Sequence, residues 1–297
     1  MRVEERLSSI NAETNLYLVL GNPVRHSLSP VIHNAGFEAL KVNSLYLASE
    51  VSEEQIAEAI EGLKVLGIAG ANITSPFKEA VIPYLDSITD VAEMLRSVNT
   101  IVNSNGRLVG YSTDGAGFIS ALEHLAPDYD FNSPATIVGA GGAARAVAYA
   151  LAEKGVEEFN LINRSRARAD LLHKLLIDNF SLECSVHSLE SPGLDSLINK
   201  SSLIVYTLPT DSLEFISALQ NRYPQKAPAD RTIMIDLRYS PSVTEVMKQF
   251  IKAGGRAFNG SEMLFGQALY AFELFTGLSA PVEAMRQAYN KALEKGD

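Results

Sequence analysis

The chain has 297 residues, of which 46% are hydrophobic, and its formal net charge is −10. This length suits one large or two medium domains with a substantial core. The negative charge argues against nucleic acid or an anionic membrane surface as the main partner. The chain has no apolar run near the roughly 18 residues of a membrane-spanning helix. Cys184 is the only cysteine, so no intrachain disulfide can form, and we expect a cytoplasmic protein in which Cys184 is structural.

The first third of the chain predicts strands that alternate with helices. Ser29 suits an N-cap and Pro30 a first helical position, while Ser52 and Gln55 form a capping box. Asn105-Gly106 predicts a hairpin turn. We therefore expect strands at 16–20, 45–48, 65–74, 95–102 and 107–110, and helices at 29–40, 56–63 and from 76 onward.

The rest of the chain repeats a strand-helix pattern. Strands are expected at 135–138, 159–162, 182–186, 203–207 and 232–236, and helices at 145–154, 167–179, 243–253, 262–275 and 281–295. Strands that alternate with helices imply an α/β fold in which helices cover both faces of a parallel sheet.

A glycine-rich turn between the first two of these strands predicts a dinucleotide site. Gly139, Gly141 and Ala144 give the G-x-G-x-x-A spacing directly after a strand and at the start of a helix. The first glycine permits a tight turn, the second admits the pyrophosphate, and the small third residue lets helix and strand pack closely. The free N–H groups of the helix then face the phosphates.

The segment after the second strand indicates NADP. NAD enzymes usually place an acid there, whereas this chain has Asn163-Arg164-Ser165-Arg166-Ala-Arg168. Arginines suit a 2′-phosphate, and we predict that Arg164 and Arg168 bind it. Arg166 is equally explained as a solvated helix residue.

Polar residues after the early strands could hold a small anionic substrate. Ser27 and Ser29 lie where two hydroxyls and helix N–H groups can bind a carboxylate, although Ser29 is also explained as an N-cap. The segment Gly70–Lys78 places Lys78 behind Pro76 in an expected first helical turn. There the helix dipole would disfavour the charged ammonium and promote proton exchange, although Lys78 could instead be a solvated surface residue.

Five motifs in sequence resemble the shikimate dehydrogenase family over nearly the whole chain. They are Gly21-Asn-Pro-Val-Arg-His-Ser-Leu-Ser-Pro30, Gly70-Ala-Asn-Ile-Thr-Ser-Pro-Phe-Lys78, Val98-Asn-Thr-Ile101, Gly110-Tyr-Ser-Thr-Asp-Gly-Ala-Gly-Phe118 and Asn259-Gly-Ser-Glu-Met-Leu-Phe-Gly-Gln-Ala268. The resemblance implies an N-terminal substrate-binding domain at 1–115, a Rossmann-like NADP-binding domain at 116–258, and C-terminal helices at 259–297 that return to the first domain. It also implies reversible, NADP-dependent reduction of 3-dehydroshikimate to shikimate in chorismate and aromatic amino-acid biosynthesis.

The resemblance assigns roles to individual residues. Lys78 and Asp114 would be the catalytic pair, although Asp114 before Gly115 could also be a turn residue. The substrate would be bound by Ser27, Ser29, Asn72, Thr74, Asn99, Tyr239 and Gln267, with Tyr239 in the cleft between the domains. The cofactor would be bound by Gly139, Ala140, Gly141, Gly142, Ala143, Asn163, Arg164, Ser165, Arg168, Thr207, Gly260 and Met263. No metal is expected, and the oligomeric state, monomer or homodimer, is left open.

Some positions depart from the family pattern and leave alternatives open. Arg96-Ser97 and Ser112 differ from the usual residues, and Tyr206 to Thr210 replaces a loop expected beside the nicotinamide. We expect the bulk of Tyr206 and the stiffness of Pro209 to slow turnover. The alternatives are a paralogue that prefers quinate or another cyclic hydroxy acid, and a non-catalytic ligand sensor. Retention of Lys78 and Asp114 argues against the sensor.

Overall fold

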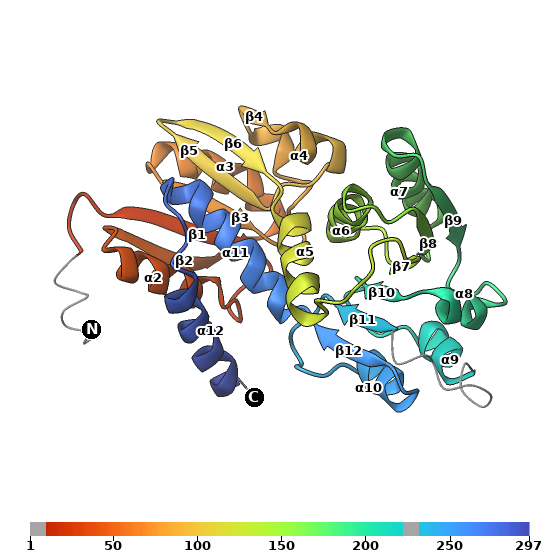
Figure 1. The fold of residues 1–297 in the computed structure, drawn as a ribbon. Coiled ribbons are helices and arrows are strands. Elements are labelled where there is room, and N and C mark those ends of the chain that lie inside the picture. The colour runs from red at the N-terminus through yellow and green to blue at the C-terminus, as the bar shows by residue number, and fades with distance from the viewer. Residues whose placement is uncertain (1–9, 222–231, 297) are drawn as a thin grey trace. The chain divides into compact units, whose positions relative to one another are not determined.

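The computed structural model describes residues 10–221 and 232–296. The chain divides into two compact units (Figure 1). Unit 1 ends at Thr113 and resumes at Leu264, and unit 2 is Asp114–Met263. The sequence predicted domain boundaries after residues 115 and 258. In the structure the first boundary lies slightly earlier, after Thr113, and the second lies slightly later, after Met263.

Unit 1 contains a six-stranded mixed sheet in the order β2-β1-β3-β5-β6-β4. The first three strands are mutually parallel, β5 is antiparallel to β3 and β6, and β4 is parallel to β6. Its elements are β1 (Asn15–Gly21), α2 (Ser29–Leu40), β2 (Ser44–Glu50), α3 (Ile56–Val65), β3 (Gly70–Ile73), β4 (Ser87–Ile88), α4 (Asp90–Leu95), β5 (Thr100–Ser104), β6 (Arg107–Tyr111), most of α11 (Ser261–Thr276) and α12 (Val282–Gly296), with single 3₁₀ turns at Glu53–Gln55 and Ile82–Tyr84.

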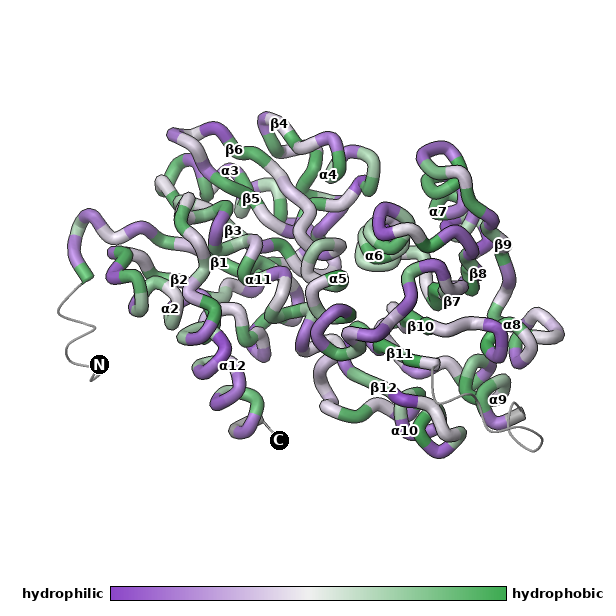
Figure 2. Tube along the Cα trace, in the orientation of Figure 1, coloured by the Kyte–Doolittle hydropathy of each residue, from purple (hydrophilic) through white to green (hydrophobic). Residues whose placement is uncertain are grey.

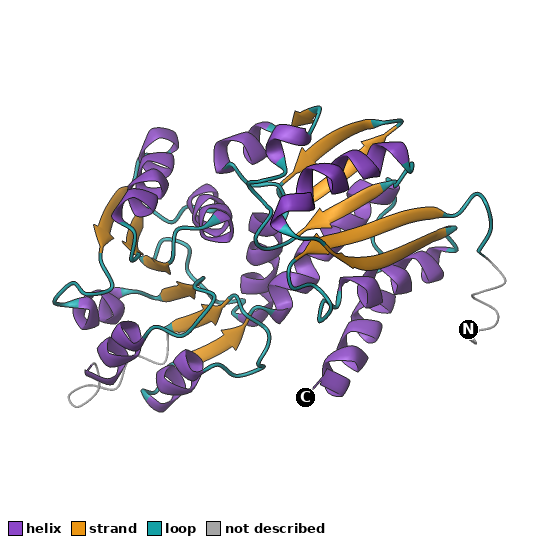
Figure 3. Ribbon diagram, turned by 180° about the vertical axis from the view of Figure 1, so that it is seen from behind, coloured by secondary structure: helices purple, strands orange, loops and turns teal. Residues whose placement is uncertain are grey.

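Both faces of this sheet are covered by helices (Figure 3). Alternate residues of β1 face opposite cores: Tyr17 and Val19 pack with α2, α11 and α12, whereas Leu18 and Leu20 pack on the side of α3. A strand buried on both faces reads as a continuous apolar run, which is why 16–20 was recognisable in the sequence.

Unit 2 is a doubly wound sheet of six parallel strands in the order β12-β11-β10-β7-β8-β9. The order reverses between β7 and β10, which is the position where such sheets bind ligands at the carboxyl ends of their strands. Its elements are α5 (Asp114–Leu125), β7 (Ala135–Val138), α6 (Gly142–Glu153), β8 (Glu158–Ile162), α7 (Arg166–Asn179), β9 (Glu183–His187), α8 (Leu194–Lys200), β10 (Leu203–Tyr206), α9 (Leu213–Asn221), β11 (Ile233–Asp236), α10 (Glu245–Lys252) and β12 (Arg256–Asn259).

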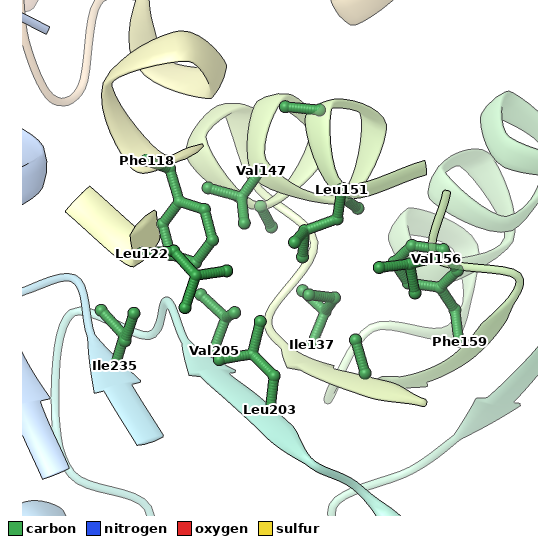
Figure 4. Packing of buried hydrophobic residues seen from close by; sticks show 14 of the residues in the cluster. Phe118, Leu122, Ile137, Val147, Leu151, Val156, Phe159, Leu203, Val205 and Ile235 are labelled. Atoms are coloured by element: carbon green, nitrogen blue, oxygen red, sulfur yellow. The ribbon is translucent and has the colours of Figure 1, made fainter. Parts of the chain in front are cut away.

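The core of unit 2 joins α5 and α6 to the middle of this sheet. Phe118 and Leu122 of α5 lie beside Val147 of α6 and above Ile137 and Val205 of the strands (Figure 4). The alanine-rich helix α6 is largely hydrophobic along its length (Figure 2). Its small side chains allow close packing against α5, since a Cβ on Gly115 would lie 2.8 Å from the Ala146 carbonyl oxygen.

Two predicted strands begin later than expected, and one predicted helix is absent. Residues 65–69 are not strand: α3 extends to Val65 and is ended by Gly67, whose φ of 64° favours glycine. Residues 95–97 are not strand either, because α4 begins after Thr89, whose hydroxyl accepts from the Ala92 N–H, and ends in a left-handed Arg96.

The helix predicted to begin at Pro76 does not form. The segment 75–81 consists of turns, held by the Phe77 N–H on the Thr74 carbonyl and the Val81 N–H on the Phe77 carbonyl. Pro83 lacks an N–H and cannot continue a helix, so a helix that began at Pro76 would have to end within about two turns. No helix dipole therefore acts on Lys78, and that part of the sequence argument was wrong.

Candidate functional site: a dinucleotide loop and a buried amide network

The turn after β7 lies against the end of β10. Gly139 has a φ of 115°, and a Cβ there would collide with Thr207 Oγ1. Thr207 donates from both its N–H and its hydroxyl to the Val138 carbonyl, at 2.8 and 3.0 Å. The close approach explains the first glycine of the fingerprint and places Ala140 and Thr207 at the point where the strand order reverses.

The second fingerprint glycine has no such explanation within the protein. Gly141 is the N-cap of α6 with an ordinary φ of −83°, and a Cβ there would meet no atom within 4 Å. No side chain caps this helix, so the first N–H groups, from Gly142 and Ala143 onward, are open to a ligand. A phosphate that approaches the backbone accounts for both facts, so the loop fits a dinucleotide.

The three arginines after β8 differ in their contacts. Arg166 Nε forms an ion pair with Asp170 at 2.8 Å, and its guanidinium also reaches the Val186 carbonyl. Arg164 and Arg168 are exposed. Ser165 caps α7 by accepting from the Arg168 N–H, and Asn163 is buried with its amide on the Ser165 carbonyl. The cap and the amide fix the backbone that carries Arg164 and Arg168.

Gly260 and Met263, which the sequence predicted to bind the cofactor, are tightly packed at the end of unit 2. A Cβ on Gly260 would collide with the backbone of Leu237, so glycine is required there by close approach. Met263 is 7% exposed and belongs to the apolar core around α5 and α6. Tyr239 is partly buried, and burial raises the pKa of its hydroxyl.

Tyr206 is a core residue, so the expectation that its bulk lies beside the nicotinamide was wrong. Its side chain is fully buried under α9, in the cluster on the face opposite Val205. The hydroxyl donates to the Thr210 carbonyl and accepts from the Ser212 N–H, both at 2.8 Å. Burial raises its pKa to about 12, so it stays neutral. Tyr206 therefore stabilises the loop from within.

Asp211 holds the same loop from the other side. Arg238 donates to Asp211 at 2.8 Å and to the fully buried Asp236 at 2.6 Å. Although burial acts in the opposite direction, the hydrogen bond from Arg238 lowers the pKa of Asp211. The substitutions Tyr206→Asn and Asp211→Gly would thus remove supports of the loop.

In unit 1, residues from distant segments meet in a buried amide network. Asn72 on β3 donates to the Asn99 carbonyl at 3.1 Å, and Asn99 donates to Thr113 Oγ1 at 2.9 Å and to Gln267 Oε1 on α11 at 3.3 Å. Thr113 returns a backbone N–H to Asn99 Oδ1 at 2.7 Å. The sequence predicted Asn72, Asn99 and Gln267 for the site. It missed Thr113, although Thr113 directly precedes Asp114 in the motif Gly110–Phe118.

The two serines lie together at the start of α2. Ser27 donates to the Ser29 hydroxyl at 3.2 Å, and the Ser29 N–H lies 3.3 Å from Ser27 Oγ. Ser29 is the first residue of the helix and its side chain caps nothing, since the N-cap is Leu28. The predicted N-cap role is therefore wrong, which removes the competing explanation for Ser29.

Lys78 is anchored next to the network through its backbone. Its carbonyl accepts from the Val98 N–H at 2.9 Å, directly before Asn99. Phe77, fully buried, fixes the preceding residue. Thr74 hydrogen-bonds through its N–H to the Leu20 carbonyl at the end of β1. Asp114 follows Thr113 and is the first residue of α5, with 3% exposure.

Within residues 10–221 and 232–296, no helix is long and apolar enough to cross a membrane. In the same part of the chain, no group of three or more His, Cys, Asp and Glu side chains could hold a metal ion.

Comparisons with known proteins agree along most of the chain. Residues 19–101 match the shikimate dehydrogenase substrate-binding domain, 126–253 match shikimate/quinate 5-dehydrogenase, and 260–288 match the shikimate 5′-dehydrogenase C-terminal domain. The NADP(+) shikimate dehydrogenase of Caldanaerobacter subterraneus subsp. tengcongensis is 39% identical, over 90% of this chain and 94% of that protein. That of Moorella thermoacetica is 40% identical, over 96% and 95%.

A solved structure is similar over nearly the same length. The Thermus thermophilus shikimate 5-dehydrogenase in complex with NADP(H) and shikimate aligns with a TM-score of 0.76 at 31% identity, covering 94% of this chain and 99% of that one. On the sequence similarity and the shared two-unit fold, the chain belongs to the shikimate dehydrogenase family.

Proposed function

We propose that this protein is an NADP-dependent shikimate dehydrogenase that interconverts 3-dehydroshikimate and shikimate. The observation that carries the proposal is the amide network of Asn72, Asn99 and Gln267. These side chains come from three distant segments, and they are amides, a group that suits the adjacent hydroxyls of a polyhydroxylated ring. Relatives that are 39% and 40% identical over most of the chain bear the same activity in their names.

In the proposed mechanism, each polar group of the substrate has a partner. Ser27 and Ser29 bind the carboxylate, and Thr74, Asn72, Asn99 and Gln267 bind the ring hydroxyls. Lys78 takes the proton of the reacting hydroxyl during oxidation and returns it during reduction, while Asp114 orients the lysine and that hydroxyl. Tyr239 is proposed as a further substrate-binding residue. NADP supplies the hydride acceptor and donor at C4 of its nicotinamide.

We propose that unit 2 holds the cofactor. Gly139 to Ala143 would bind the pyrophosphate, and Arg164 and Arg168 would bind the 2′-phosphate, on a backbone that Asn163 and Ser165 hold. Thr207, Gly260 and Met263 would contribute further cofactor contacts. The protein is further proposed to act in the cytoplasm in chorismate biosynthesis, where its single cysteine needs no oxidising compartment.

An initial-rate assay with shikimate and quinate tests the reaction. Quinate has an extra hydroxyl on the carbon that bears the carboxylate, and a buried hydroxyl without a partner costs about 1–3 kcal/mol. We expect kcat/KM with NADP to be at least tenfold higher for shikimate. A higher kcat/KM for quinate would contradict the assignment of substrate.

The arginines test the cofactor assignment. Hydrogen bonds to charged groups contribute about 1.5–3 kcal/mol each, so the wild-type protein should prefer NADP to NAD by more than tenfold in kcat/KM. The double variant Arg164→Ala, Arg168→Ala should lose this preference. The matched control is Arg166→Ala, because Arg166 is paired with Asp170 and should leave the preference unchanged. Equal use of both cofactors by the wild type would refute the assignment.

A further inference from the structure

A tyrosine that the sequence analysis did not select lies behind the predicted substrate residues. Tyr46 on β2 is fully buried, and its hydroxyl donates to Asn72 Oδ1 at 2.6 Å. Its ring stacks on His33, with 4.4 Å between ring centroids and 4° between the planes. Packing thus fixes the ring, and the ring fixes the position of the hydroxyl.

The contacts of Asn72 determine how its amide is oriented. Its Nδ2 donates to the Asn99 carbonyl at 3.1 Å and to Thr100 Oγ1 at 3.0 Å. A carbonyl only accepts hydrogen bonds, so the nitrogen must lie on that side and Oδ1 must face Tyr46. Both amide hydrogens and one oxygen lone pair are then used, which leaves one lone pair of Oδ1. Asn72 can therefore only accept a further hydrogen bond.

Tyr46 also connects the two halves of the predicted site. Burial raises the pKa of Tyr46 well above its ordinary value, while hydrogen bonds with the Asn72 backbone and with the Ser29 side chain act in the opposite direction. The hydroxyl consequently stays protonated and remains a donor. Through Ser29 it is linked to Ser27, on the side proposed to bind the carboxylate.

We propose that Tyr46 is a positioning residue for substrate binding. Its hydroxyl holds the Asn72 amide so that the remaining Oδ1 lone pair accepts a hydrogen bond from a ring hydroxyl of the substrate. Tyr46 acts through Asn72 and does not touch the reacting atoms. The inference rests on the proposed function, because it presupposes that Asn72 binds a hydroxyl of shikimate.

The test is the steady-state kinetics of Tyr46→Phe in the full-length protein. Loss of one buried hydrogen bond should raise KM for shikimate about tenfold. The values of kcat and of KM for NADP should stay within about threefold, because Tyr46 belongs to the substrate-binding network of unit 1. Tyr46→Phe should change KM for shikimate no further when Asn72 is already alanine, since the effect passes through that amide.

Tyr17→Phe is the matched control. Tyr17 is the register neighbour of Tyr46 on β1, is 4% exposed, and donates its hydroxyl to the Phe275 carbonyl at 3.0 Å, away from Asn72. It should lose a comparable amount of stability with no change in KM. If Tyr46→Phe does not fold, Thr100→Val removes a different partner of Asn72 and should raise KM for shikimate in the same way.

The outcomes separate the two proposals. A wild-type protein that does not oxidise shikimate overturns the proposed function and this inference with it. An active wild type overturns the inference alone if KM for shikimate in Tyr46→Phe rises less than twofold, or if Tyr17→Phe raises it equally. An equally large effect of Tyr46→Phe in the Asn72→Ala background would also contradict it.

Discussion

At the scale of single residues, several side chains have roles that only their surroundings reveal. His33 is fully buried, and neither ring nitrogen has a hydrogen-bond partner. It lies among Tyr46, Phe37, Phe272 and Phe275. Burial lowers its pKa to about 3. The folded protein resists protonation at His33, so the free energy of unfolding falls at any pH where the unfolded chain binds a proton there.

His33 predicts a specific pH dependence of stability. Between pH 6.5 and about 3 the unfolded state binds a proton at His33 that the folded state does not, so stability falls as the pH falls through this window and is unaffected above it. The expected loss between pH 7 and pH 5 is about 2 kcal/mol. His33→Leu should remove that share of the loss, as measured by urea unfolding at both pH values. An unchanged pH dependence in the variant would show that His33 is protonated in the folded protein.

At the scale of elements, strands were easier to predict than the ends of helices. The apolar runs of β7, β8, β10 and β11 are buried on both faces and stand out in the sequence. The C-terminal end of α3 could not be recognised in the sequence, because Val65 and Leu66 continue an apolar run although each is 75% exposed. The turns around Lys78 bury Phe77 and hold the Lys78 carbonyl against the Val98 N–H. Hydrophobic periodicity in the sequence does not reveal such contacts.

The β7–α6 loop offers a pair of glycines whose replacement should separate stability from binding. Gly139→Ala places a side chain at a positive φ against Thr207 and should cost about 1–3 kcal/mol in stability. Gly141→Ala meets no atom and should change stability by less than about 0.5 kcal/mol. It should nevertheless weaken NADP binding at least tenfold, because the methyl group occupies the path of the pyrophosphate.

Thermal unfolding and NADP titration of both glycine variants measure the two effects. If Gly141→Ala binds NADP as tightly as the wild type, the phosphates do not approach this loop, and the placement of the cofactor would have to be revised.

At the scale of the whole molecule, the α/β fold and the family followed from motifs spread along the chain. What the sequence could not provide was the set of contacts behind those motifs. Tyr46, Thr100 and Thr113 were missed because their importance lies in hydrogen bonds between distant segments. Tyr206 was misjudged because its strand register, which turns it into the core, is set by pairing with β7 and β11.

The measurement that tests the central claim most directly is kcat for Lys78→Ala with shikimate and NADP. Proton transfer by a positioned side chain is typically worth roughly 10²–10⁴ in rate, so kcat should fall by that factor while KM for shikimate changes only a few-fold. Lys64→Ala, which removes a lysine paired with Asp86 at 3.1 Å in the same unit, should leave kcat unchanged. A loss below about tenfold for Lys78→Ala, or an equal loss for Lys64→Ala, would contradict the proton-transfer role on which the proposed mechanism depends.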